Sequence, residues 1–222
     1  MRDDLERQLD DPPQQVVELG ERTDRMLAAA SHALRDGDAD AAAGVVAGDV
    51  EVDRLDAEVQ HGVVTTIARH GPVGLDLRRL TAMLRASLHL ERMGDYAVNV
   101  ARAAQRSAPF PADDELATQL SEMGELARDV GRTALRSFVH ADAELALTVP
   151  ALDDGVDRLN VGIFHRLVRL AAVDEHRLEW ATRMILVARQ LERYGDHGVD
   201  LAEQTLFVVT GEPQELSSND PD

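Results

Sequence analysis

The chain has 222 residues, a formal net charge of −18, no cysteine and only 3% aromatic residues. The lack of cysteine excludes disulfides, thiolate metal sites and a cysteine nucleophile, and the negative charge is the opposite of what nucleic-acid binding requires. No apolar run reaches the length of a membrane span and the chain opens with charged residues, so we expect a cytoplasmic protein without membrane insertion.

Apolar residues recur at helical spacing through most of the chain, and glycine and proline gather between the periodic stretches. The core must consist of leucine, valine, alanine and methionine, a composition that favours helices over sheets. The pattern predicts six helices, which span residues 16–35, 40–69, 75–106, 114–140, 143–173 and 177–209. Because Pro109 and Pro111 flank Phe110, no helix can continue through this segment, and we place a domain boundary there.

The third and sixth predicted helices carry nearly the same sequence. LERMGDYAVNVA begins at Leu90 and LERYGDHGVDLA begins at Leu191, and seven of the twelve positions are identical. Upstream, DVEVDRL from Asp49 matches DDGVDRL from Asp153. One unit of about a hundred residues is therefore used twice.

From this repeat we predict an all-α protein of two tandem, pseudo-symmetric antiparallel three-helix bundles. The first repeat is assigned to residues 1–109 and the second to residues 110–212. Residues 213–222 are rich in Ser, Asn, Asp and Pro, and we expect them to form a disordered tail.

Each repeat contains two acidic pairs, and the members of each pair are four residues apart, so they lie on one helix face. The four acids of the first repeat are Asp49, Asp53, Glu91 and Asp95, and those of the second are Asp153, Asp157, Glu192 and Asp196. The pairs lie on neighbouring helices, so the four carboxylates of a repeat could converge on a hard cation such as magnesium, calcium, manganese or iron. The alternative interpretation is a solvated or arginine-bridged acidic face.

The arginines next to these acids do not favour bridging within one helix, because adjacent residues point about 100° apart. We therefore expect that Arg92 does not serve Glu91 and Asp95. Gly94 and Gly195 recur in the two signatures although a mid-helix glycine costs roughly 1 kcal/mol relative to alanine. This recurrence predicts the close approach of another helix at both positions.

The two D-x-x-x-D-x-L segments and the two L-E-R-x-G-D-x-x-x-N/D-x-A segments resemble the PhoU family of phosphate transport accessory proteins. The resemblance extends over residues 1–212. It implies metal clusters on the acidic face of each bundle, held by the four carboxylates of that repeat. Iron and zinc occur in some members of the family, and manganese and magnesium are further candidates for the metal here.

The resemblance also implies a non-enzymatic regulator of phosphate uptake and homeostasis. Such a regulator negatively controls the phosphate-starvation response by acting between the ATPase subunit of the phosphate ABC transporter and a sensor histidine kinase, usually as a homodimer. The chain departs from the family at Arg102, where Glu is frequent, and at Asp200, where Asn is usual. We therefore expect unequal metal affinity in the two repeats, with the second site more acidic.

A different class of function remains open from the residues alone. Carboxylate-bridged metal sites in helical bundles also occur in hydrolases and oxidases, so a metal-dependent enzyme is the alternative. The sequence offers no paired base and nucleophile and no set of histidines supporting the carboxylates. We therefore predict no catalytic residues, no organic cofactor and no enzymatic activity.

Overall fold

The computed structural model describes residues 2–110 and 112–216, of which residues 2–13 are described by their backbone alone. The described part is helical and contains no strand, and its elements are α1 (Arg2–Asp36), α2 (Ala39–Ala47), α3 (Asp49–His70), α4 (Leu75–Ser107), α5 (Asp114–His140), α6 (Ala143–Ala146), α7 (Val149–Val173), the 3-10 helix η1 (Glu175–Arg177) and α8 (Leu178–Thr210). The predicted all-α class is confirmed.

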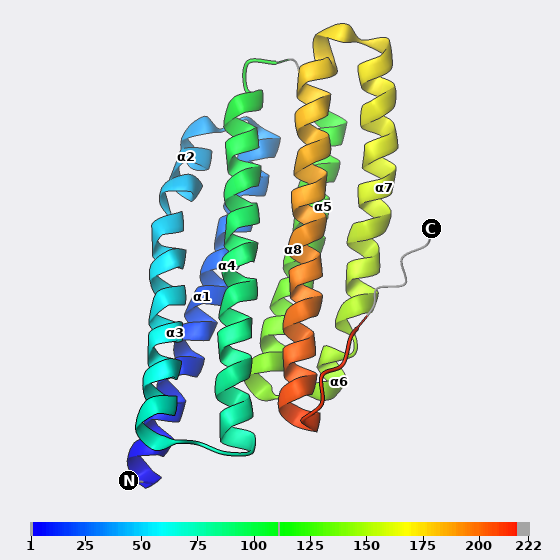
Figure 1. Ribbon diagram of the computed structural model, residues 1–222. Coiled ribbons are helices and arrows are strands. Elements are labelled where there is room, and N and C mark those ends of the chain that lie inside the picture. Colours follow the sequence, from blue (N-terminus) through cyan, green and yellow to red (C-terminus); the bar gives the residue numbers. More distant parts are fainter. Residues whose placement is uncertain (1, 111, 217–222) are drawn as a thin grey trace.

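The helices form two bundles that stand side by side (Figure 1). The first contains α1, α2 with α3, and α4, and the second contains α5, α6 with α7, and α8. The long helices α4 and α8 pack against each other at the centre and run in opposite directions, while α3 and α7 lie at the outer edges. The predicted pair of three-helix bundles is therefore confirmed.

Two predicted helices are each divided into a short and a long helix. The predicted helix 40–69 is interrupted at Gly48, whose N–H bonds the carbonyls of both Gly44 and Val45 as in a tightened last turn. The predicted helix 143–173 is interrupted before Pro150, which has no N–H and is tolerated only in the first turn of α7. The prediction of unbroken helices was wrong because it overlooked this glycine and this proline.

Equivalent N-terminal caps begin α2 in the first bundle and α6 in the second. Asp38 accepts hydrogen bonds from the N–H groups of Asp40 and Ala41, and Asp142 accepts one from Leu145. These aspartates satisfy N–H groups that the first turn of a helix leaves without partners. At the other end of α3, Gly71 adopts φ 56°, a left-handed conformation that glycine adopts without strain.

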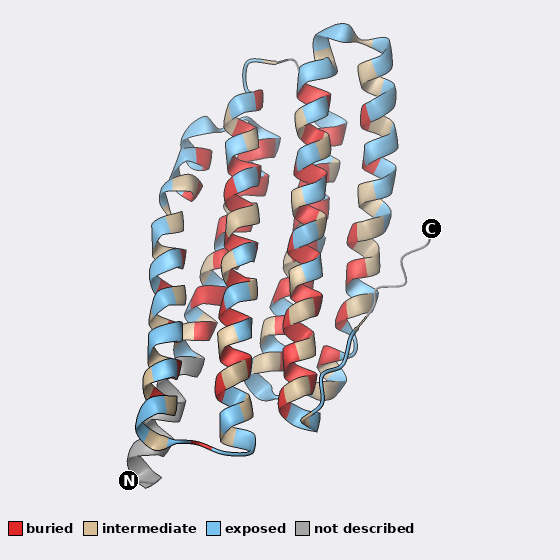
Figure 2. Cartoon of the chain, in the orientation of Figure 1, coloured by how far each residue is buried: buried red, intermediate tan, exposed pale blue. Residues whose placement is uncertain are grey.

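One continuous apolar core runs through both bundles, along the sides of the helices that face one another (Figure 2). Leu27 and Leu90 from the first bundle and Met123 and Leu191 from the second are all fully buried in it. A polar clamp crosses between the bundles, where Arg128 of α5 donates two hydrogen bonds of 2.9 Å to the carboxylate of Asp24 in α1. The two repeats therefore share a core.

Between the two bundles, α4 ends at Ser107 and α5 begins at Asp114. Pro111, one of the two prolines used to place the boundary, lies outside the described residues. In the predicted tail, Leu216 is partly buried against the core, and its N–H donates to Glu203 Oε1 at 2.8 Å. Residues 217–222 of that tail lie outside the described part. Among the described helices, none has both the length and the apolar character needed to cross a membrane.

Candidate functional site

The second repeat buries an aspartate against the glycine of its signature. Asp153 lies in the second turn of α7 and is only 1% exposed. A Cβ atom added to Gly195 of α8 would lie 2.1 Å from Asp153 Oδ1, so a larger residue at this position would displace the carboxylate from its present place. The predicted close approach at Gly195 is thus made by an acidic side chain from the neighbouring helix.

The four predicted acids of the second repeat affect one another's ionisation. Burial raises the pKa of Asp153 to about 8, and the charges of Asp157, Asp196 and Glu192 add to the shift. Burial also raises the pKa of Glu192 to about 7, with a further contribution from Asp196. The other three carboxylates are therefore near enough to Asp153 for the charge of each to disfavour its ionisation.

Several oxygens in this cluster are buried without a hydrogen-bond partner among the described residues. They are both carboxylate oxygens of Asp153 and Oε2 of Glu192, whose other oxygen pairs with Arg189. A buried carboxylate without donors costs several kcal/mol unless it is protonated or binds a cation. A set of donors made entirely of carboxylate oxygens fits a hard cation, so the residues present are compatible with the metal that the sequence predicts.

The acids do not form a closed coordination sphere. In the described part of the chain, no three of the eight predicted acids offer ligand atoms that all lie within 4.8 Å of one another. The side chains of each cluster would have to draw together by rotamer changes to share one ion. The arrangement is therefore a cluster of carboxylates in which several buried oxygens have no hydrogen-bond partner among the described residues.

The first repeat assembles the same acids in a more open arrangement. Burial raises the pKa of Asp49, and the charges of Asp53 and Asp95 raise it further, whereas the positive charge of Arg102 acts in the opposite direction. Burial and the charge of Asp95 raise the pKa of Glu91 in the same way.

The two signature glycines have different neighbours. A Cβ atom on Gly94 would meet Val52 Cγ1 at 3.0 Å, so an apolar side chain takes the place that Asp153 has beside Gly195 in the second repeat. Glu203 stands in the second repeat where the first has Arg102, and it accepts a hydrogen bond from the Leu216 N–H. The second site is therefore the more acidic of the two, as the departures in sequence suggested, and it contains the one buried carboxylate among the eight acids, that of Asp153.

One expectation about the arginines is wrong. Arg92 donates from Nη1 to Asp95 Oδ2 at 3.2 Å, and its Nε lies 3.6 Å from Glu91 Oε2. The angle between adjacent residues of a helix fixes only the direction in which each side chain leaves the backbone. The long side chain of Arg92 then bends along the helix surface and reaches both acids. Arg54, in contrast, forms ion pairs with Glu51 and Glu58 rather than with Asp53.

Sequence reasoning missed three groups near the acids. Arg189 pairs with Glu192 from one turn earlier on α8, and Asp56 and Asp154 each have a buried oxygen without a partner. The i, i+3 spacing of Arg189 and Glu192 was a usable signal. Asp154 was a second usable signal, because it directly follows Asp153 in the sequence. In the structure its charge also raises the pKa of Asp153.

The comparisons with known proteins agree on one family. The family model described as "PhoU domain" matches twice, at residues 16–104 and 120–205. A protein from Xylella fastidiosa named "Phosphate-specific transport system accessory protein PhoU homolog" is 31% identical over 92% of this chain and 88% of its own length. A protein of the same name from Deinococcus radiodurans is 33% identical over 95% of this chain and 99% of its own length.

Solved structures give the same result at the level of the fold. The crystal structure of PhoU from Pseudomonas aeruginosa superposes with a TM-score of 0.89 at 28% identity, covering 93% of this chain and 99% of that one. The phosphate transport system regulatory protein PhoU from Streptococcus pneumoniae, 22% identical, has the same fold with a TM-score of 0.87 over 96% of this chain and 100% of that one. With two matches to the family model, one in each bundle, the chain belongs to the PhoU family.

Proposed function

We propose that this protein is a regulator of phosphate transport that represses the phosphate-starvation response when phosphate is abundant. The observation that carries the proposal is the similarity along nearly the whole chain to phosphate transport accessory proteins, at 31% identity over 92% of its length. The two bundles and both acidic signatures are present, so neither half of the family's architecture is missing.

The proposed partners are the ATPase subunit of the phosphate ABC transporter and a sensor histidine kinase. The name of the relatives supports the first partner, since they are called accessory proteins of the transport system. The kinase follows from the family resemblance. The net charge of −18 supports association with basic patches on both partners, because opposite charges accelerate encounter and make it sensitive to salt.

We also propose a homodimer. On α7, at the outer edge of the second bundle, Val161 is 58% exposed, Phe164 is 44% exposed and Val168 is 45% exposed. They are spaced three and four residues apart, so they form one apolar stripe on the outside of the helix. Such a stripe on an outer helix supports contact with a second copy of the chain.

A hard cation at the acidic faces is the remaining part of the proposal. In the second repeat Asp153, Asp157, Glu192 and Asp196 would hold it, and in the first repeat Asp49, Asp53, Glu91 and Asp95 would do so. The orphaned oxygens of Asp153 and Glu192 support this assignment most strongly. The ion would neutralise the clustered charge and connect the two helices of each bundle that carry the acids, α3 with α4 and α7 with α8.

The partners are tested by affinity capture of the full chain from phosphate-replete cells of its host. At low salt we expect the transporter ATPase and a histidine kinase among the captured proteins, and we expect several-fold less of both at high salt because screening weakens charge attraction. Mass spectrometry identifies the captured proteins. Recovery of neither partner, together with robust phosphoester hydrolysis by the purified protein, would favour the metal-dependent enzyme.

A further inference from the structure

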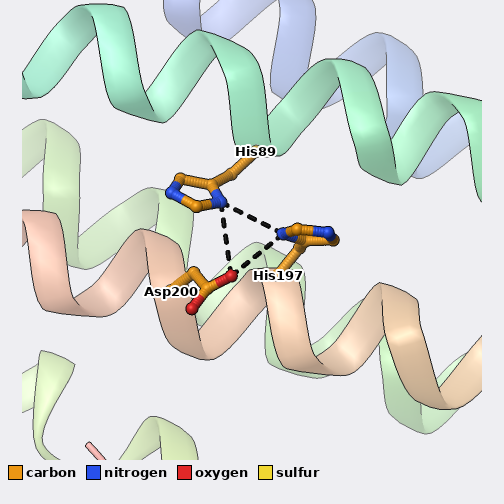
Figure 3. A group of neighbouring side chains, drawn as sticks. All are labelled: His89, His197 and Asp200. Atoms are coloured by element: carbon orange, nitrogen blue, oxygen red, sulfur yellow. Dashed lines mark hydrogen bonds and ion pairs between the residues drawn. The ribbon is translucent and has the colours of Figure 1, made fainter. Parts of the chain in front are cut away.

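Two histidines and an aspartate, none of them among the eight predicted acids, meet between the central helices (Figure 3). His89 projects from α4 of the first bundle, and His197 and Asp200 project from α8 of the second. The Nδ1 atoms of the two rings are 3.0 Å apart, and both rings face Asp200 Oδ2, at 3.4 Å from His89 Nδ1 and 3.0 Å from His197 Nδ1. In the described part of the chain it is the one group of three such residues with all ligand atoms within 4.8 Å of one another.

The size of this triangle matches one face of a tetrahedral zinc site. With zinc–nitrogen and zinc–oxygen bonds of about 2.0–2.1 Å, the ligand atoms of a tetrahedron lie about 3.3 Å from one another. The three edges here measure 3.0, 3.0 and 3.4 Å. An ion placed over the triangle would therefore reach all three atoms with small movements of the side chains.

A hydroxyl group supports the ligand orientation of one histidine. Tyr96 Oη lies 3.3 Å from His197 Nε2, and the two rings are stacked. If Nε2 carries the proton and donates to the hydroxyl oxygen, Nδ1 presents its lone pair toward the triangle. Histidines that bind metals generally donate the other ring N–H to such a partner.

The site is accessible enough to take up an ion. The side chains of His89 and His197 are 17% and 22% exposed, whereas that of Asp200 is 42% exposed. The imidazoles are thus held by packing between α4 and α8, and the carboxylate side opens to solvent. A fourth position on that side is available to water, as in zinc sites with three protein ligands.

The internal repeat provides a reference without the metal-binding groups. Across the pseudo-twofold axis, Gln190 takes the place of His89 and Asn99 takes that of Asp200, and Asn99 Nδ2 donates to Gln190 Oε1 at 3.0 Å. The fold therefore accepts a neutral amide pair at the same place between the central helices. The histidine and carboxylate version is not required for helix packing, so its presence on one side needs another explanation.

We propose that His89, His197 and Asp200 bind a zinc-class divalent ion that links the two repeats. Imidazole is a good ligand for zinc, copper and nickel and a poor one for magnesium. The site differs from the acidic faces in ligand type and shares none of the eight predicted acids. Binding would connect α4 to α8 and thereby fix the relation between the two bundles.

The test compares the parent with H89Q/D200N, which copies the amide pair already present across the axis. Both proteins are stripped with a chelator and titrated with Zn²⁺ in excess Mg²⁺, which competes with Zn²⁺ for sites made only of oxygen ligands. We expect the parent to bind one more zinc ion per chain than the double variant and to show the visible absorption of tetrahedral cobalt when Co²⁺ is used instead. Q190A serves as the matched control and should leave both readouts unchanged.

Tyr96→Phe should weaken zinc binding by about 10-fold, as loss of a supporting hydrogen bond to a metal-binding histidine does. Circular dichroism of each variant checks that it folds, and H89Q alone replaces the double variant if the latter does not. Equal zinc stoichiometry and affinity in the parent and the folded variant would overturn the proposal, as would a parent that binds no zinc in the presence of magnesium.

Discussion

Replacing Asp153 with asparagine is expected to stabilise the metal-free protein at pH 8. The carboxylate is 1% exposed, and neither of its oxygens has a hydrogen-bond partner among the described residues. Its ionised form is therefore poorly tolerated in the fold, and asparagine has the same shape without the charge. The free energy of unfolding, measured by urea denaturation in the presence of a chelator, should rise by a few kcal/mol.

The direction of the pH dependence follows from the raised pKa. In the unfolded chain the pKa of Asp153 is about 3.8, and in the folded protein it is about 8. The folded state binds the proton more tightly, so the contribution of Asp153 to stability is most favourable at low pH and declines as pH rises between these two values. One pKa unit is worth 1.36 kcal/mol, so the metal-free parent should lose about 2 kcal/mol from this group between pH 6 and pH 8. The D153N variant should lose less.

The same variant tests the cation. Mn²⁺ or Mg²⁺ should raise the melting temperature of the parent by mass action, because the ion relieves the repulsion among the acids. D153N, and separately E192Q/D196N, should lose the part of this gain that arises in the second repeat. D49N, the matched change in the more open first repeat, should alter metal-free stability much less. Full cation stabilisation in E192Q/D196N would show that the second site is misassigned.

Gly198→Ala is expected to destabilise the protein by about 1–3 kcal/mol, the usual range for overpacking a close contact. A Cβ atom at Gly198 of α8 would lie 2.8 Å from Val130 Cγ1 and 3.4 Å from the backbone nitrogen of Gly131 in α5. Val130 is fully buried, and its branched side chain has few alternative rotamers. The two helices would therefore have to separate, which thermal or urea unfolding would detect.

Gly162→Ala is the matched control for this substitution. Gly162 also lies within a helix, α7, but nothing lies within 4 Å of a Cβ atom built there. Alanine should stabilise the protein by about 0.5–1 kcal/mol because it restricts the unfolded chain and favours the helix. A loss of stability in both variants, or in neither, would contradict the close approach of α5 and α8 at Gly198.

The fold was largely predictable because the helical periodicity within each segment agreed with the repetition of the whole unit along the chain. Helical periodicity and the duplicated signature fixed the helix type, their order and the two bundles. The shared core was not predictable, since α1 and α5 join it through contacts between residues a hundred or so positions apart, such as the 2.9 Å hydrogen bonds from Arg128 to Asp24. The spacing of residues along one helix does not show which residues of a distant helix they contact.

The candidate site was predictable in composition and only partly in geometry. Register between the repeats identified the eight acids. It did not show that Asp153 is buried against Gly195 whereas Val52 is the neighbour of Gly94, because that difference depends on how each helix pair packs. The cluster of His89, His197 and Asp200 was also invisible, since two of its members come from one helix and the third from the other repeat.

The most direct test of the proposed regulatory role is the expression of phosphate-starvation genes in the host after deletion of this gene. In phosphate-rich medium we expect these genes to be switched on in the deletion strain and switched off again when the intact gene is returned. Reporter fluorescence or transcript counts provide the measurement, with phosphate-limited wild-type cells as the reference for full induction. Starvation genes that stay off in the deletion strain in rich phosphate would contradict a role in repressing the phosphate-starvation response.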